Sequence, residues 1–105
     1  MENYTIQQGE TIRLKVTVKE SGADTAELYA SDGTNTIENT VSFSGNEADL
    51  TTNTSPTQVP GTYPYYVRIT WLDGSVDILT LNESCEDNED CGLPAITVCE
   101  IKQGV

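Results

Sequence analysis

Apolar and polar residues alternate in short blocks along this chain, and helical periodicity is almost absent. The clearest block runs from Thr11 to Lys19, where every second position is apolar: Ile12, Leu14, Val16 and Val18. A period of two places these side chains on one face of a strand and the polar side chains on the other face. We therefore predict a half-buried β-strand over this block.

The same pattern predicts several further strands, separated by turns that contain Gly, Asp, Asn or Ser. They run from Tyr4 to Gln7, Thr25 to Ala30, Thr36 to Ser44, Ala48 to Thr51 and Ala95 to Lys102. Their apolar positions are expected to point inward, and these are Ala26, Leu28, Ala30, Ile37, Val41, Phe43, Ile96 and Val98. The polar segment 51–60 is expected to be a mobile loop.

The strongest signal lies between Thr62 and Leu81, where alternate positions hold Tyr63, Tyr65, Val67, Ile69 and Trp71. The pair Asp73-Gly74 follows, and it favours a two-residue type I′ hairpin turn because both positions need positive φ. Such a turn would set Trp71 opposite Val76 and Ile69 opposite Ile78, with all four side chains on the core face. We predict a β-hairpin with this register.

Seven or eight short antiparallel strands within 105 residues indicate one all-β domain spanning residues 1–105. An immunoglobulin-like β-sandwich is the fold that this pattern favours, and a small β-barrel is the alternative. The hydrophobic fraction of 36% implies a thin core. Two packed layers of sheet would meet that need.

Acidic residues outnumber basic residues by 17 to 5, which gives a net charge of −12. Such a field repels phosphate backbones and anionic headgroups, so neither nucleic acid nor a membrane is expected as a partner. No apolar run is long enough to span a bilayer, and the opening Met1-Glu2-Asn3-Tyr4 lacks the features of a secretory signal. We expect a soluble chain that is made in the cytoplasm and binds basic surfaces.

Catalytic chemistry finds little support in the sequence. The chain has no His, which removes the commonest general base and the Ser-His and Cys-His nucleophile pairs. Phosphate-binding and nucleophile-elbow glycine motifs are absent as well. The tripeptide Asp24-Thr25-Ala26 is only faintly similar to an aspartic-protease motif and is better explained as a turn entering a strand. We expect a protein that is not an enzyme.

The segment 82–92 is an acidic loop bracketed by Cys85 and Cys91. These two cysteines are predicted to be close enough for a disulfide in oxidised material, although a cytoplasmic origin argues against one. Asp87, Glu89 and Asp90 could offer oxygens to Ca²⁺, but the ligand spacing and the internal Gly of a calcium loop are missing. A solvated acidic loop is the simplest interpretation, with a cation site or contact with a partner's basic patch as alternatives. No other cofactor is expected.

Two further features are interpreted as structural. Cys99 lies on the strand face opposite Ile96 and Val98, and we expect a small buried or half-buried side chain. The aromatic cluster of Tyr63, Tyr65, Tyr66 and Trp71 could stack on sugars or a peptide, but its alternate members lie on the apolar face of the predicted hairpin. A core role is therefore favoured for Trp71 and the odd-numbered tyrosines.

As a whole the chain resembles small immunoglobulin-like virion proteins of tailed bacteriophages, including head decoration proteins and baseplate-type modules. The segments that carry the resemblance are Gly9 to Val16, Pro60 to Tyr63, Tyr66 to Gly74 and Leu93 to Val98. The resemblance implies a non-enzymatic accessory protein of the virion that docks on a capsid, neck or tail protein, where it could be homo-oligomeric. A carbohydrate-binding or receptor-binding β-sandwich module is the alternative function.

Overall fold

The computed structural model describes residues 3–79 and 93–100, and within these ranges the protein consists of strands and connecting turns. The strands are β1 (Tyr4–Gln7), β2 (Thr11–Ile12), β3 (Lys15–Thr17), β4 (Ala23–Ser31), β5 (Thr36–Ser42), β6 (Glu47–Asp49), β7 (Thr52–Asn53), β8 (Gly61–Trp71), β9 (Val76–Leu79) and β10 (Ala95–Cys99). The prediction of an all-β chain is confirmed. In the described ranges we find no helix that is long and apolar enough to cross a membrane.

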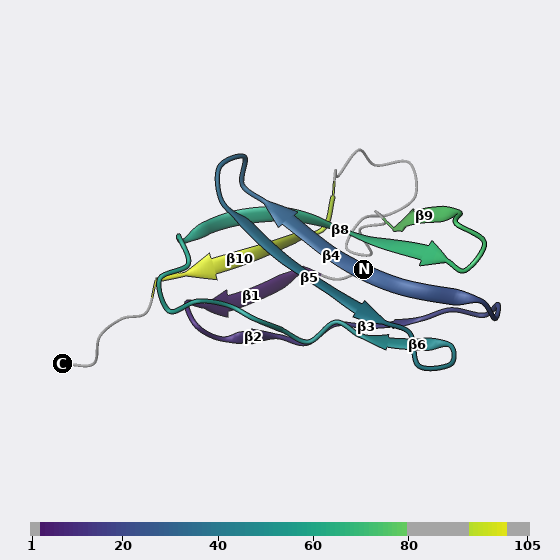
Figure 1. Ribbon diagram of the computed structural model, residues 1–105. Coiled ribbons are helices and arrows are strands. Elements are labelled where there is room, and N and C mark those ends of the chain that lie inside the picture. The colour runs from purple at the N-terminus through teal and green to yellow at the C-terminus, as the bar shows by residue number, and fades with distance from the viewer. Residues whose placement is uncertain (1–2, 80–92, 101–105) are drawn as a thin grey trace.

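Six strands form one large sheet in the order β1-β10-β8-β4-β5, with β9 paired to the remaining length of β8 (Figure 1). The strand pairs of this sheet are antiparallel except β1 and β10, which run parallel, with Tyr4 opposite Ile96. The expectation that all strands are antiparallel is therefore wrong for this pair. Parallel neighbours need a long connection, and here nearly the whole chain separates them.

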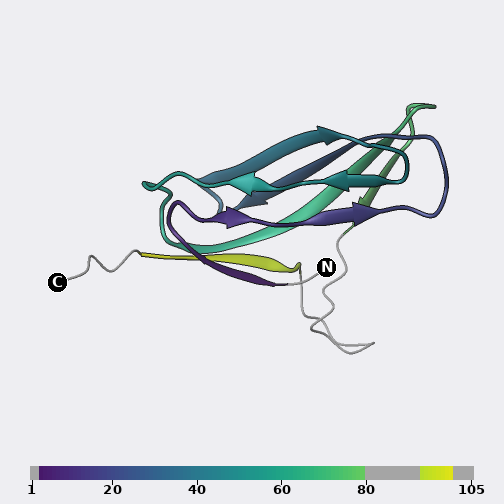
Figure 2. The same ribbon diagram turned by 90° about the horizontal axis from the view of Figure 1, so that it is seen from below.

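Two short ribbons lie against the inner side of the large sheet (Figures 1 and 2). One ribbon pairs β2 with β7, and the other pairs β3 with β6. The strand predicted from Thr11 to Lys19 is thus divided into β2 and β3, although Ile12, Leu14 and Val16 all face inward as expected. Between the ribbons the Leu50 amide donates a 2.8 Å hydrogen bond to the Leu14 carbonyl, so pairing continues across the break.

The core lies between the large sheet and the two ribbons. Its buried apolar residues include all the alternate positions predicted for β4, for β10 and for most of β8. These are Ala26, Leu28, Ala30, Ile96, Val98, Tyr63, Tyr65, Val67 and Ile69. Ile37 is also buried, whereas Val41, Phe43 and Trp71 are half-buried and pack against the cluster. The period of two therefore predicted the inward face of these strands correctly.

The segment 51–60, predicted as a loop, contains β7 and two buried threonines. The Thr52 hydroxyl donates to the Leu50 carbonyl at 2.8 Å, and the Thr54 hydroxyl donates to the Glu10 carbonyl at 2.6 Å. Because both hydroxyls find backbone acceptors, these polar side chains are buried without an unsatisfied donor. The first part of the segment therefore belongs to the packed body.

Candidate functional site

The β8–β9 hairpin is present, but its register differs from the prediction by one residue. Val76 lies opposite Thr70, and Ile78 lies opposite Arg68. The Trp71 amide donates to the Ser75 carbonyl at 2.9 Å, and the Gly74 amide donates back to the Trp71 carbonyl at 2.9 Å. The connection therefore has three residues, Leu72, Asp73 and Gly74, where the sequence predicted two.

Gly74 explains why a longer loop is favoured. It has a φ of 90°, the left-handed conformation that ends the common three-residue hairpin loop. The Asp73 carboxylate accepts hydrogen bonds from the Ser75 amide at 2.8 Å and from the Ser75 hydroxyl at 2.6 Å. These bonds lower the pKa of Asp73 from its ordinary value of 3.8, the hydroxyl contributing most and the amide next.

The changed register turns Val76 and Ile78 of β9 outward, because a slip of one residue moves each side chain to the other face. Val76 is 40% exposed and Ile78 is 56% exposed, so the prediction that both are core residues is wrong. Leu72 in the loop is 73% exposed. The hairpin thus presents three large apolar side chains to solvent, and Asp77 takes the position opposite Ile69, where it is exposed.

The loop between β3 and β4 lies beside the start of this hairpin. The Leu72 amide donates a 2.8 Å hydrogen bond to the Gly22 carbonyl. Next to this contact the pairing of β4 with β8 shifts register between Ala23 and Thr25, so that Ala23 lies opposite Trp71. Bulges of this kind bend a strand and change the direction of nearby side chains. Residues 20–22 are thereby held against the hairpin.

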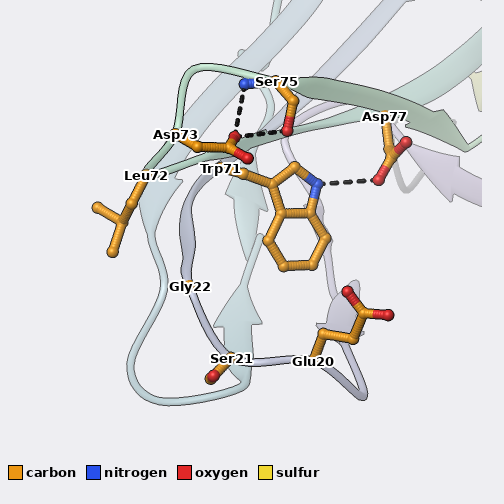
Figure 3. A pocket seen from close by; sticks show the side chains of 8 residues that line it. All are labelled: Glu20, Ser21, Gly22, Trp71, Leu72, Asp73, Ser75 and Asp77. Atoms are coloured by element: carbon orange, nitrogen blue, oxygen red, sulfur yellow. Dashed lines mark hydrogen bonds between the residues drawn. The ribbon is translucent and has the colours of Figure 1, made fainter.

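Trp71 forms the centre of a depression of about 400 Å³ between this loop and the hairpin (Figure 3). The lining residues are Glu20, Ser21, Gly22, Trp71, Leu72, Asp73, Ser75 and Asp77. The indole Nε1 donates a 2.9 Å hydrogen bond to Oδ2 of Asp77. Figure 3 shows the ring face-on, with Asp77 and Glu20 near its edge and Leu72 pointing away from it.

The depression is acidic. Its lining includes three carboxylates, Glu20, Asp73 and Asp77, and no basic side chain. A second depression of about 420 Å³ shares Glu20, Trp71 and Asp77, and it is also lined by residues 17–19 and by apolar residues of β8 and β9. The pattern of the sequence did not reveal this arrangement, because Trp71 was interpreted as a core residue and Glu20 was assigned no role.

The other predicted sites gain no support. Cys85, Cys91, Asp87, Glu89 and Asp90 lie outside the described residues. Within residues 3–79 and 93–100 no three His, Cys, Asp or Glu side chains form a group that could hold a metal ion. A disulfide between the two cysteines and a calcium site therefore remain predictions.

Cys99 is exposed at the end of β10, so the expectation of a buried or half-buried thiol is wrong. Its outward direction, opposite Ile96 and Val98, is as predicted. Among the aromatic residues, Tyr66 lies on the outer face of the sheet, where its ring packs against Tyr29 at a centroid distance of 5.4 Å. Tyr63 and Tyr65 are fully buried, which leaves Trp71 and Tyr66 as the partly accessible members of the predicted cluster.

In comparisons with known proteins, no family model matches the chain, and no curated protein or solved structure matches it either.

Proposed function

We propose that this chain is a non-enzymatic accessory protein that docks on a larger protein assembly through the β8–β9 hairpin. The resemblance of its segments to virion proteins of tailed phages makes a capsid, neck or tail protein the expected partner. Under this proposal the domain works by surface contact, and its location is the assembled particle.

An immunoglobulin-like sandwich is the fold that we propose for this role. In variable immunoglobulin domains one sheet contains strands G, F, C and C′, and strands B and E belong to the other sheet. The order β10-β8-β4-β5 corresponds to G-F-C-C′, while the ribbons pair the chain segment before β4 with the segment before β8, as B pairs with E. The chain order of these elements is consistent with that assignment.

Tyr63 provides a second, independent support for this fold. It lies near the start of β8, and its hydroxyl donates a 2.5 Å hydrogen bond to the carbonyl of Val59, four residues upstream. A tyrosine at the start of strand F that bonds back to the preceding backbone is a hallmark of these sandwiches. Tyr65 stands two residues later, where antibody domains carry a cysteine, so the inter-sheet disulfide of those domains has no counterpart at this position.

The observation that carries the docking proposal is the gathering of exposed apolar side chains on one hairpin. Leu72, Val76 and Ile78 lie within seven residues of one another in sequence, on a hairpin at one end of the molecule (Figure 1). Elsewhere in the described residues only Val59 and Leu93 are large, apolar and exposed. Apolar side chains grouped on an otherwise charged surface are typical of a protein-binding face, where their burial stabilises the complex.

The high negative charge supports the same role. A net charge of −12 disfavours association between copies of the free chain and attracts a basic partner surface. An apolar hairpin on a strongly acidic domain can therefore remain accessible until that partner is met.

A carbohydrate-binding module is the second candidate, and Trp71 is the observation that favours it. A half-buried indole beside carboxylates is an arrangement that also stacks on sugar rings. The two functions separate experimentally, because the first requires a protein lattice and the second requires a glycan.

The proposal is tested in cells that produce the native assembly. A variant with Leu72→Ser, Val76→Thr and Ile78→Thr is compared with the wild-type chain, and Val59→Thr serves as a control for loss of an exposed apolar side chain. We expect the wild-type chain and the control at stoichiometric ratio in the purified particle and at least a tenfold loss of the triple variant, while all three remain folded. Recovery of the wild-type chain solely as a free monomer with glycan affinity would favour the second candidate.

A further inference from the structure

We infer that the depression around Trp71 binds a cationic side chain, the guanidinium of an Arg or the ammonium of a Lys, presented by the docking partner. This inference deepens the proposed function and rests on it for the source of the ligand. The chemistry of the depression can be tested without any partner.

The indole ring supplies one half of the recognition. Trp71 is half-buried, so part of its surface is in the core and part lines the depression. The hydrogen bond from Nε1 to Asp77 holds the ring in one orientation. A cation over the face of Trp is attracted by the ring quadrupole, and Trp binds cations better than the other aromatic side chains do. A ring that is already oriented loses little entropy when the ligand arrives.

The carboxylates supply the other half. Oδ2 of Asp77 accepts the indole N–H, which leaves Oδ1 available for a second donor. Glu20 has no hydrogen bond or ion pair to the described part of the chain, and it lines the same depression as the indole (Figure 3). Asp73 contributes charge but uses Oδ1 for the amide and hydroxyl of Ser75. Two carboxylates are thus free to accept from a guanidinium stacked on the ring.

The depression offers carboxylate acceptors and no basic side chain, and this favours a cationic ligand over a neutral one. A sugar or a neutral peptide would cover Glu20 and Asp77 and remove water from carboxylates that it does not neutralise, which costs free energy. A guanidinium offers five donors and a positive charge that offset the loss of water. The geometry of the loop and the hairpin is already in place, since Leu72 and Gly22 are joined by a backbone hydrogen bond.

Lys19 provides an internal check on the inference. It lines the neighbouring depression that shares Glu20, Trp71 and Asp77, so its ammonium competes electrostatically with a cation from outside. Replacing Lys19 by Gln should therefore strengthen binding, whereas loss of a carboxylate should weaken it.

The test uses the full chain and a capped peptide, acetyl-Gly-Arg-Gly-amide, with acetyl-Gly-Gln-Gly-amide as the neutral control. Trp71 is the single Trp of the chain, so one indole N–H resonance reports on the depression in an NMR titration. We expect a saturable shift of this resonance with the Arg peptide alone, weaker at higher salt. Glu20→Gln and Asp77→Asn should each weaken binding by about two- to fivefold, while Lys19→Gln should tighten it. Asp77→Asn retains an acceptor for the indole N–H and therefore preserves the orientation of the ring.

Absence of a shift with the Arg peptide, or equal shifts with both peptides, would overturn the inference. So would Arg binding that neither carboxylate variant changes. A saturable shift with a neutral oligosaccharide such as cellohexaose, in place of the Arg peptide, would assign the depression to a sugar. Since no partner is present in this titration, its outcome is independent of whether the hairpin variant is lost from the particle.

Discussion

Ile69 of β8 lies directly opposite Asp77 of β9 and packs in the core, while its neighbour in the predicted register, Ile78, lies on the solvent side of the sheet. Two isoleucines on paired strands therefore occupy opposite environments. The three-residue loop ending at Gly74 is the cause, because a two-residue loop would have placed both on the same face.

The first prediction follows from this relationship. Ile69→Ala removes side-chain atoms from the core and should lower the free energy of unfolding by about 2–5 kcal/mol. Ile78→Ala removes exposed atoms and should change it by less than about 0.5 kcal/mol. Urea unfolding followed by Trp71 fluorescence measures both. A comparable loss in the two variants would mean that the sequence-derived register is the right one.

The second prediction concerns the left-handed residue of the loop. A Cβ at Gly74 would meet no atom within 4 Å, so the effect of a substitution there comes from the backbone alone. Gly74→Val should destabilise the domain by about 1 kcal/mol or more, because a β-branched residue resists a φ of 90°. Gly74→Asn should cost less, since Asn tolerates this region. Equal stabilities of the two variants in thermal unfolding would contradict a left-handed conformation at this position.

The third prediction tests the tyrosine at the start of β8. Tyr63 donates to the Val59 carbonyl and accepts a 3.1 Å hydrogen bond from Nε2 of Gln58. Tyr63→Phe leaves both groups without this partner and should lower the free energy of unfolding by about 1–3 kcal/mol. Tyr66→Phe is the matched control, because its hydroxyl forms no hydrogen bond to the residues described and its loss should be nearly neutral. A neutral Tyr63→Phe variant would remove this support for the immunoglobulin-like fold.

Alternation of side chains correctly predicted the buried face of β4, β8 and β10. This part of the fold depends only on the order of residues within one segment, since a strand places successive side chains on opposite faces. The buried tyrosines followed from the same rule.

The register of the hairpin could not be obtained in this way. Ser75 to Ile78 alternates perfectly, and this pattern favours Val76 and Ile78 on the inward face, but the length of the loop sets the register and turns them outward. Gly74 is compatible with a two-residue and with a three-residue loop. The Asp73 and Ser75 pair that caps the longer loop was the available signal, and it was overlooked.

The candidate site depended on contacts between distant segments. Glu20 is brought to Trp71 through the hydrogen bond between Gly22 and Leu72, and no local pattern contains both segments. The parallel pairing of β1 with β10 joins the two ends of the described chain and has the same origin. Pairings of this kind are decided by the packing of the whole core.

The fourth prediction concerns acid. Hydrogen bonds from the Ser75 hydroxyl and amide lower the pKa of Asp73 below its ordinary value of 3.8. A carboxyl whose pKa is lower in the folded protein stabilises the fold fully above the unfolded pKa and loses that contribution as the pH falls through the folded pKa. Asp73→Ala should therefore be less stable than the wild-type chain at pH 6, and the difference should shrink as the pH falls below 3.8. Unfolding in urea at a series of pH values between 6 and 2 measures this difference in stability.

Comparison of Asp73→Ala with the wild-type chain separates the effect of Asp73 from the effects of Asp32 and Asp49. The pKa values of these two carboxyls are also lowered by hydrogen bonds, but both residues are present in both proteins, so their contributions cancel in the difference. A difference that stayed constant or grew on acidification would show that the Asp73 carboxylate does not stabilise the hairpin loop.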